Sequence, residues 1–422
     1  MRALRISACA ADPCPRSRRR PNTFSSTSRP ERDEPSPTPA SSETAPASDS
    51  LALTRRGVGA AAVSAAAALS LRPEPAHSAL NLPKTNLPRS PEAALRRSIP
   101  IVSPEVEKVQ GKLEEVAFFL RIPQRKPWGQ MQGNVDASRE TLKASPEAIL
   151  SFVPAADRPA ALALTESLQQ DLTRMTEAIG LRDPDRTSIR TAQALEHVAE
   201  LEMLQVPDLP YVLPKQYRER PRLIGRATAE AVLERPGGSF GLIAGEEAKT
   251  ISLTLTLDGY NAPLTAGNFL TLVKSGAYDG CTLAAGDFSL FATAKASAAA
   301  TAEPPLPLEF RALGEFEPRY KLPLNVEGAE ELPQLPLSVP GAVAMGRSAT
   351  DGFSSSESFF FYLFDRRNSG LGGLSFDEGS FSVFGYVTGG VAELAKLRGG
   401  DRIRSFRITS GEDKLVLPAP QA

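Results

Sequence analysis

The stretch KTISLTLTLDGYNAPLTAGNFLTLVKSGAYDG, residues 249–280, decides the fold of the second half of this chain. In its first part, apolar residues alternate with serine and threonine, which predicts a half-buried β-strand. The apolar members of this alternation are Ile251, Leu253, Leu255 and Leu257. After Pro263 the apolar spacing changes to three or four residues, and Gly276 follows the last of them. This change predicts a short helix directly after the strand, with Phe269, Leu272 and Val273 facing inward.

Further strand-like segments follow this helix. They are GAVAMGR, SFFFYLF, FSVFGYV and DRIRSFRIT, with one short helical segment, VAELAKL, before the last. Many strands with two short helices and no β-α-β rhythm predict a closed β-barrel.

The first half has helical spacing instead. In SPEVEKVQGKLEEVAFFLR, Ser103 is placed to cap a helix whose first residue is Pro104. Two longer helices are expected at about 157–179 and 185–206. The residues expected on the inward stripes of the three helices are Val106, Val109, Leu113, Val116, Leu120, Leu164, Leu168, Leu172, Met175, Ile179, Ile189, Ala192, Leu195, Val198 and Leu201. Because each stripe needs a partner, we expect a small antiparallel helical bundle.

Composition excludes several function classes. The chain has 422 residues and a net charge of −1, which gives no general electrostatic reason to bind nucleic acid. Its two histidines, His77 and His197, argue against a histidine-rich metal site and against a Ser-His-Asp triad. Cys281 is the only cysteine outside the segment that we expect to be removed, so no internal disulfide is expected. We expect no cofactor and no metal.

The first eighty residues have the composition of a targeting region. Residues 1–50 are rich in Arg, Ser, Pro and Thr and show no apolar periodicity, as in a chloroplast transit peptide. Arg55 and Arg56 precede an alanine-rich run that is too short to span a bilayer. With the small residues Ala76 and Ser78 before Ala79, residues 51–79 are typical of a twin-arginine signal. A bacterial export signal would leave the first fifty residues without a use. Two signals in series predict the thylakoid lumen.

The expected organisation has five parts. A transit peptide at 1–50 and a lumenal targeting signal at 51–79 precede a helical bundle at 80–206. A proline-rich segment at 207–247 is expected to be an extended arm. A β-barrel domain at 248–420 follows, interrupted at about 292–340 by a low-complexity, proline-rich surface insertion. The mature chain is not expected to span a membrane.

Three segments of the second half resemble cyclophilins. APLTAGNFLTLVKSGAYDG is similar to the start of the first barrel helix in that family, SFFFYLF to the aromatic strand under the proline pocket, and FDEGSFSVFGYV to the strand after it. The whole mature chain is similar to the plant and algal thylakoid-lumen cyclophilins that carry an N-terminal helical bundle. The resemblance implies an eight-stranded barrel capped by two helices, and peptidyl-prolyl cis-trans isomerisation as the family activity. It also implies roles in photosystem assembly.

Laid onto the family pattern, the chain departs at the positions that carry the chemistry. Cyclophilins are understood to use an arginine near the prolyl nitrogen, and that position is Ala285. The resemblance implies substrate binding at the pocket positions, which are Leu290, Phe291, Ser358, Phe360, Phe376 and Phe381, with Thr293 at one glutamine position. Aromatic residues are kept, and the cationic and amide groups are lost. Arg347 is the candidate substitute for the missing cation.

Two functions are compatible with this pattern of site residues, and a third is that the helical bundle is the functional module and the barrel only a regulatory partner. The first is a binding protein that holds proline-containing segments of lumenal or thylakoid membrane proteins, such as photosystem subunits, during assembly, with weak or absent catalysis. The second is an active prolyl isomerase whose cation is displaced to Arg347. Site residues rather than fold decide function, and these residues favour the first.

Overall fold

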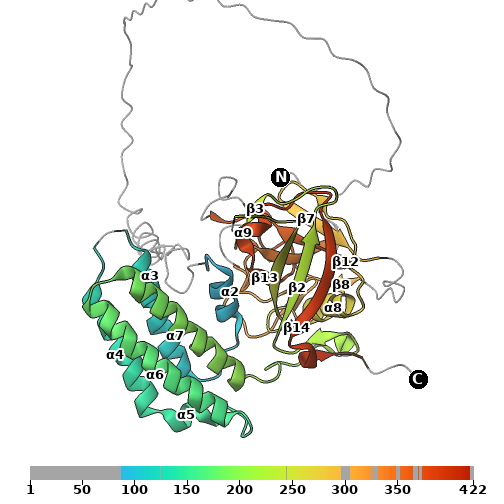
Figure 1. Ribbon diagram of the computed structural model, residues 1–422. Coiled ribbons are helices and arrows are strands. Elements are labelled where there is room, and N and C mark those ends of the chain that lie inside the picture. The colour runs from blue at the N-terminus through green and yellow to red at the C-terminus, as the bar shows by residue number, and fades with distance from the viewer. Residues whose placement is uncertain are drawn as a thin grey trace, which may run out of the picture. The chain divides into compact units, whose positions relative to one another are not determined.

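The computed structural model describes residues 87–123, 125–243, 245–295, 305–324, 326, 331–347, 352–364, 369 and 373–418 (Figure 1). The expected transit peptide and twin-arginine signal therefore lie outside the described residues. No helix in the described part of the chain is both long enough and apolar enough to cross a membrane.

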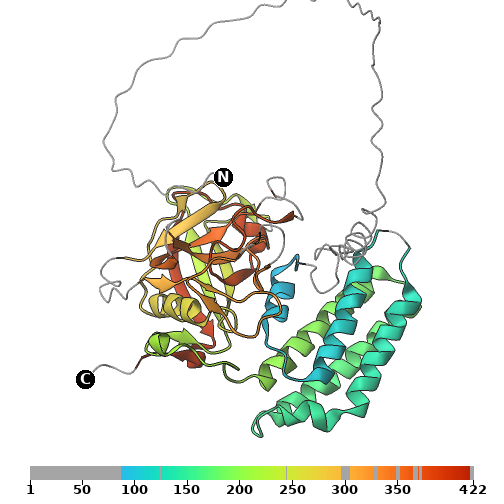
Figure 2. The ribbon, with the colours of Figure 1, turned by 180° about the vertical axis from the view of Figure 1, so that it is seen from behind.

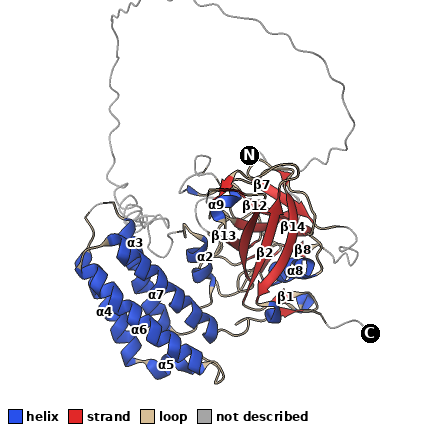
Figure 3. Ribbon diagram, viewed as in Figure 1, coloured by secondary structure: helices blue, strands red, loops and turns tan. Residues whose placement is uncertain are grey.

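Helices make up the described chain before residue 206 (Figure 3). They are α2 (Pro91–Ser98), α3 (Pro104–Arg121), α4 (Trp128–Ala144), α5 (Pro146–Ser151), α6 (Arg158–Gly180) and α7 (Pro184–Gln205). The predicted cap of α3 is confirmed, because the Ser103 side chain accepts a hydrogen bond from the Val106 amide. Asp183 caps α7 in the same way through the Arg186 amide, and a proline follows each cap.

Helices α3 to α7 share one apolar core. The predicted stripes of α3 and α6 are largely buried there, including Leu113, Leu168 and Leu172. On α7, however, Ile189 is exposed, and Thr187 and Thr191 face inward instead. The Thr191 hydroxyl donates to the Thr187 carbonyl at 2.7 Å, so its polar atom is satisfied inside the helix. The threonines therefore replace the predicted stripe only in the first part of α7, while Leu195, Val198 and Leu201 are buried as predicted.

No helix is predicted from the sequence at the position of α4. The structure makes Trp128 the first residue of α4. The buried face of α4 includes Asn134 and Ser138 among its apolar residues, and these interrupt the hydrophobic periodicity. His197 is hydrogen-bonded, as expected, through its Nδ1 atom to the buried carboxylate of Asp171 at 2.8 Å.

One curled antiparallel sheet dominates the second half. Its strand order is β14-β2-β5-β13-β11-β12-β7-β6, and β8 pairs with β12. The bounds are β2 (Arg226–Glu234), β5 (Thr250–Asp258), β6 (Ala284–Ala285), β7 (Ser289–Thr293), β8 (Leu306–Pro307), β11 (Ala342–Arg347), β12 (Phe353–Tyr362), β13 (Val383–Gly389) and β14 (Arg402–Ser410). The two ends of the sheet approach each other at an isolated bridge between Thr282 and Arg402. The sheet is thus a half-barrel whose ends meet at this bridge and at backbone hydrogen bonds between residues 280–283 and 400–403.

Smaller elements complete this half. Two-stranded pairs join β1 (Arg222–Leu223) to β15 (Leu415–Val416), β3 (Leu242–Ile243) to β4 (Glu246–Glu247), and β9 (Glu309–Phe310) to β10 (Arg319–Tyr320). The helices are α8 (Pro263–Lys274), α9 (Val391–Leu394) and the short turns η3 (Lys215–Tyr217) and η6 (Glu412–Lys414). Helix α8 packs against the sheet (Figure 2) and places Phe269 among the rings of Tyr278, Phe359, Phe384 and Phe406.

Strand β2 corrects the prediction of an extended arm at 207–247. Residues 226–234 pair on one side with β5 and on the other with β14, and alternate residues are buried. The five prolines that suggested an arm, at positions 207, 210, 214, 221 and 236, all lie outside this strand. Its buried face is mostly alanine, which gives a weak apolar signal although alanine packs well under neighbouring strands.

The segment 305–340 also differs from its prediction as a surface insertion. Its buried residues include Leu306, Leu308, Phe310, Arg311, Leu332, Leu335, Leu337 and Val339. The expectation is therefore wrong for this part of 292–340, while 292–293 belong to β7 and 296–304 lie outside the described residues. Prolines hold the backbone extended, and the leucines between them reach the core.

Two buried carboxylates anchor this segment. Glu309 accepts hydrogen bonds from the Thr265 amide and hydroxyl, both at 2.9 Å, at the first turn of α8. Glu378 accepts from the amides of Leu337 and Ser338, at 2.6 and 2.9 Å. Burial raises the pKa of both carboxyls, to about 7 for Glu309. Backbone amides pointing at a carboxylate oppose that rise by favouring its ionised form.

A third buried carboxylate, Asp258, joins α2 to the sheet. It accepts from the Arg226 Nε atom at 3.1 Å and from the Ser98 hydroxyl. The Arg226 guanidinium also donates to the Leu95 carbonyl, and Arg311 donates to the Ser98 carbonyl. Asp258 is fully buried. Its carboxylate thus accepts hydrogen bonds from β2, from α2 and, at 2.8 Å, from the Asn261 amide that follows β5.

We predict that Asp258→Ala lowers the free energy of unfolding by about 3–5 kcal/mol, because it leaves buried guanidinium charge uncompensated. Urea unfolding followed by circular dichroism measures the free energy of unfolding of each variant. Glu412→Ala is the control, since Glu412 pairs with Lys274 at a half-exposed site and should cost less than about 1 kcal/mol. Equal losses for the two variants would contradict the role given to Asp258.

We predict that Glu309 makes the fold less stable as pH rises. Its folded pKa of about 7 lies above the ordinary value of 4.5, so the stabilisation is complete below about 4.5 and is lost as pH rises to about 7. The loss is at most about 3.5 kcal/mol, since one pKa unit corresponds to about 1.4 kcal/mol. Glu309→Gln should flatten this pH dependence in urea titrations at a series of pH values. An unchanged slope would show that Glu309 does not titrate in this range.

Candidate functional site

A row of aromatic rings lies on the outer face of β7 and β12. Phe291 is paired in register with Phe360, and their ring centroids are 5.1 Å apart. Phe381, just before β13, meets Phe360 edge-on, also at 5.1 Å. The structure therefore brings together three of the predicted pocket residues. We call Phe291, Phe360 and Phe381 the aromatic row.

Two glycines flank Phe291. A Cβ atom on Gly286 would lie 2.9 Å from the Phe291 Cε2 atom, and one on Gly346 would lie 3.8 Å from its Cε1 atom. The ring thus lies between the backbone that follows Ala285 and the backbone that precedes Arg347. Glycine at 286 leaves room for the ring where any larger residue would collide with it.

The other predicted pocket positions have different fates. The Thr293 and Ser358 hydroxyls are 2.8 Å apart on neighbouring strands, so the two glutamine positions of the family hold a hydroxyl pair. Leu290 is buried in the sheet interior, because alternate residues of β7 face opposite sides; this differs from its predicted place in the pocket. Phe376 is 82% exposed, and no ring of the aromatic row contacts it among the described residues.

The aromatic row is continuous with a larger apolar cluster. Phe360 is 2% exposed, while Phe291 and Phe381 are half-buried. The cluster also contains Ala94 and Leu95 of α2, and Leu335, Leu337 and Val339 of the 305–340 segment. The 305–340 segment, which was expected to be a surface insertion, therefore packs in the same apolar cluster as the aromatic row.

The two positions considered for a cation lie apart. Ala285 is exposed at the end of β6 and is paired in register with Leu290. Arg347 donates from its Nη1 atom to the Ser380 carbonyl at 2.7 Å, directly before Phe381. Arg347 is thus held near the Phe381 end of the row. Burial raises the pKa of the nearby Asp377 carboxyl.

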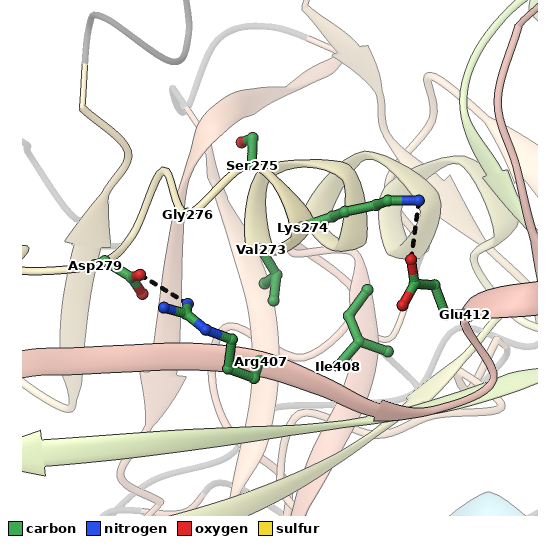
Figure 4. Close-up of a pocket in the computed structure, with 8 residues that line it drawn as sticks. All are labelled: Val273, Lys274, Ser275, Gly276, Asp279, Arg407, Ile408 and Glu412. Atoms are coloured by element: carbon green, nitrogen blue, oxygen red, sulfur yellow. Dashed lines mark ion pairs between the residues drawn. The ribbon is translucent and has the colours of Figure 1, made fainter.

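A separate cleft of about 410 Å³ lies between the end of α8 and β14 (Figure 4). Val273 and Ile408 form its apolar lining, and two ion pairs span it. The Lys274 ammonium lies 2.9 Å from Glu412, and the Arg407 guanidinium 2.7 Å from Asp279. Sequence reasoning did not identify this cleft. Its charges neutralise one another in pairs, so we assign it no chemistry. The described residues hold no cluster suited to a metal ion.

Comparison with known proteins covers both halves. Residues 90–206 match the family described as "Peptidyl-prolyl cis-trans isomerase CYP38-like, PsbQ-like domain". Residues 246–412 match the family "Cyclophilin type peptidyl-prolyl cis-trans isomerase/CLD".

Three relatives are similar over most of the chain. A chloroplastic peptidyl-prolyl cis-trans isomerase, CYP37 of Arabidopsis thaliana, is 43% identical over 82% of this chain and 74% of its own length. A putative thylakoid lumen peptidyl-prolyl cis-trans isomerase of Synechocystis is 33% identical, covering 79% and 86%. Chloroplastic CYP38 of Arabidopsis thaliana is 28% identical, covering 78% and 76%.

A solved structure, cyclophilin AquaCyp293 from Hirschia baltica, is 16% identical with a TM-score of 0.27 over 46% of this chain and 80% of its own. That likeness is too weak to carry an argument. The relatives and the two family matches are sufficient. The chain belongs to the cyclophilin-type peptidyl-prolyl cis-trans isomerase family, with a CYP38-like, PsbQ-like domain before its cyclophilin domain.

Proposed function

We propose that this protein binds proline-containing segments along the aromatic row and catalyses their isomerisation weakly or not at all. One observation carries the proposal. The rings of Phe291, Phe360 and Phe381 remain in contact, while alanine occupies position 285. An apolar surface of this kind suits a prolyl ring, whereas Ala285 can donate nothing to the amide.

Catalysis needs more than an apolar surface. Rotation about an X-Pro bond crosses a barrier of about 18–20 kcal/mol, and lowering it requires a group that favours the twisted amide. Donors fixed in advance around developing charge are worth about 10²–10³-fold in rate. An aromatic row without the arginine should still bind a prolyl segment, but it should lose most of the acceleration of X-Pro isomerisation.

The setting that fits is the thylakoid lumen. The N-terminal sequence predicts import in two stages, and one relative is described as a thylakoid lumen isomerase. The partners would be prolyl segments of lumenal or thylakoid membrane proteins, such as photosystem subunits, held during assembly. We further propose that the helices form an antiparallel bundle and that the half-barrel closes as an eight-stranded barrel. In this proposal residues 80–206 and 248–420 form the two functional domains. Nucleic acid is not among the proposed partners.

Arg347 supports an alternative function as an active isomerase. Its hydrogen bond to the Ser380 carbonyl holds it near Phe381. From there it would act on the opposite side of the Phe291 ring from Ala285. This placement differs from the family's, so the alternative requires a displaced cation.

We predict that isomerase activity is at least about 10²-fold below that of a cyclophilin with a complete site, because the arginine is replaced. Nuclear magnetic resonance exchange on a short proline peptide measures the rate. Ala285→Arg should raise it, and Ala285→Gln, which adds length without charge, should not. A wild-type rate within about tenfold of a complete enzyme would contradict the proposal and favour the active alternative.

We predict that Phe381→Ala weakens binding of a proline peptide while leaving the fold intact. Phe381 is half-buried, whereas truncating the buried Phe360 would open a cavity costing about 3–5 kcal/mol. Calorimetry should show a negative heat-capacity change on binding and little effect of salt.

Phe118→Ala is the matched control, because Phe118 is an exposed phenylalanine of α3, outside the aromatic row. If the control weakens binding and Phe381→Ala does not, the helical region rather than the aromatic row captures the peptide.

A further inference from the structure

The loop between α9 and β14 lies directly against Ala285. A Cβ atom on Gly399 would lie 3.0 Å from the Ala285 Cβ atom and 3.2 Å from its amide nitrogen. Hydrogen bonds on either side hold this approach, because the Gly400 amide donates to the Leu283 carbonyl at 2.8 Å and the Leu283 amide to the Asp401 carbonyl at 2.7 Å. Glycine at 399 permits backbone to pack against the position where the family has its arginine.

Asp401 fixes the shape of this loop. It is 1% exposed, and its two carboxylate oxygens accept from the Arg235 guanidinium at 2.8 and 2.9 Å. The same carboxylate accepts from the Arg398 backbone amide at 2.9 Å. A bidentate arginine–carboxylate pair has a defined geometry. The backbone that carries the Arg398 side chain is therefore held in place next to Gly399.

The Arg398 side chain differs from the arginines around it. It is exposed, and no described residue pairs with its guanidinium. Arg402 donates to the Gly280 carbonyl and pairs with Glu234, and Arg407 pairs with Asp279. The Arg398 guanidinium, one residue before the Gly399 that contacts Ala285, thus has no ion-pair partner among the described residues.

The chain neighbours of Arg398 and Arg347 connect to different edges of the Phe291 ring, although Ala285 itself is paired in register with Leu290 and Ala284 with Phe291. Gly399 contacts Ala285, and the next residue, Gly286, flanks the Cε2 edge of the Phe291 ring. Gly346, which precedes Arg347, flanks its Cε1 edge. Of these two arginines, Arg398 lies beside the position that the family arginine occupies.

We propose that Arg398 supplies the cation that Ala285 lacks, so that the guanidinium reaches the groove from the α9–β14 loop instead of from strand β6. The inference rests on the proposed function, since it requires that a prolyl segment lie along the aromatic row. The chemistry is non-covalent. The guanidinium donates a hydrogen bond to the prolyl nitrogen as the amide twists, no bond forms or breaks, and the donor is unchanged when the amide becomes planar again. Because Arg398 is exposed, its contribution is smaller than that of a rigidly preorganised donor.

The test compares Arg398→Ala with two matched variants of the full chain, Arg347→Ala and Arg404→Ala. Arg404 is an exposed arginine of β14 outside the loop. Exchange spectroscopy on a short proline peptide gives the isomerisation rate, and calorimetry gives the affinity. We expect Arg398→Ala to lower the residual rate by about tenfold, below the 10²–10³-fold of a fully preorganised donor. We expect its affinity to change by less than about twofold, and the rate of Arg404→Ala, the matched control, to stay near that of the wild type. Arg347→Ala tests the alternative cation.

A second arm tests whether Arg398 and position 285 serve one site. In an Ala285→Arg background, Arg398→Ala should lose its effect on the rate, because groups that act at one place are not additive. The Arg398 Nε–Hε resonance should also shift when the peptide is added, which is a readout independent of turnover.

The outcomes separate the two proposals. A wild-type rate in Arg398→Ala, an unshifted resonance or a fully additive double variant overturns the role of Arg398 and leaves peptide binding intact. Loss of rate confined to Arg347→Ala also overturns it and assigns the cation to Arg347. Absence of any peptide binding by the wild-type chain overturns the proposed function itself.

Discussion

The fold of the described chain depends on a charge that water cannot reach. Asp258 ends the strand β5 that the sequence makes most certain, and it is fully buried there. Isolated in such a place, an ionised carboxylate would cost several kcal/mol. Arg226 from β2 and Ser98 from α2 both approach it, and Arg311 from the 305–340 segment binds the Ser98 carbonyl. These contacts specify where α2 and the 305–340 segment meet the sheet, and both then contribute apolar residues to the cluster behind the aromatic row.

The aromatic row shows how a site can keep its ring contacts while its chemistry changes. Ring contacts depend on volume and position, so Phe291, Phe360 and Phe381 can preserve a surface that a flat apolar ligand fits. Polar chemistry depends on individual atoms, and a hydroxyl pair between Thr293 and Ser358 satisfies itself at 2.8 Å. Such a pair neither destabilises the empty groove nor positions an amide strongly. Binding with little catalysis is the natural consequence of these substitutions.

Local pattern predicted the elements whose residues repeat strictly. Strand β5 and helices α3, α6 and α8 are all present, and Ser103 caps α3 as expected. The misses share a physical cause, which is that tertiary packing overrode a weak local signal. Strand β2 buries mainly alanines, α4 buries Asn134 and Ser138, and the leucines of 305–340 are hidden among prolines. In each case the partner elements, which no local window contains, decide the outcome.

Local sequence has the same limit at the site. It shows that the family's arginine is missing at position 285, but it cannot show which residues lie next to that position in space. More than a hundred positions along the chain separate Ala285 from Gly399, and only the approach of the sheet ends at Thr282 and Arg402 brings them together. A cation carried by the strand would depend on β6 alone. The position of a cation on the loop depends on Asp401, which holds the loop through its ion pair with Arg235. Arg235 directly follows β2, so this position also depends on the pairing of β2 with β14 at the edge of the sheet. The chemistry at the aromatic row then depends on how the sheet curls. A substitution far from the row that weakens the pairing of β2 with β14 would change the position of the cation without contacting any ring of the row.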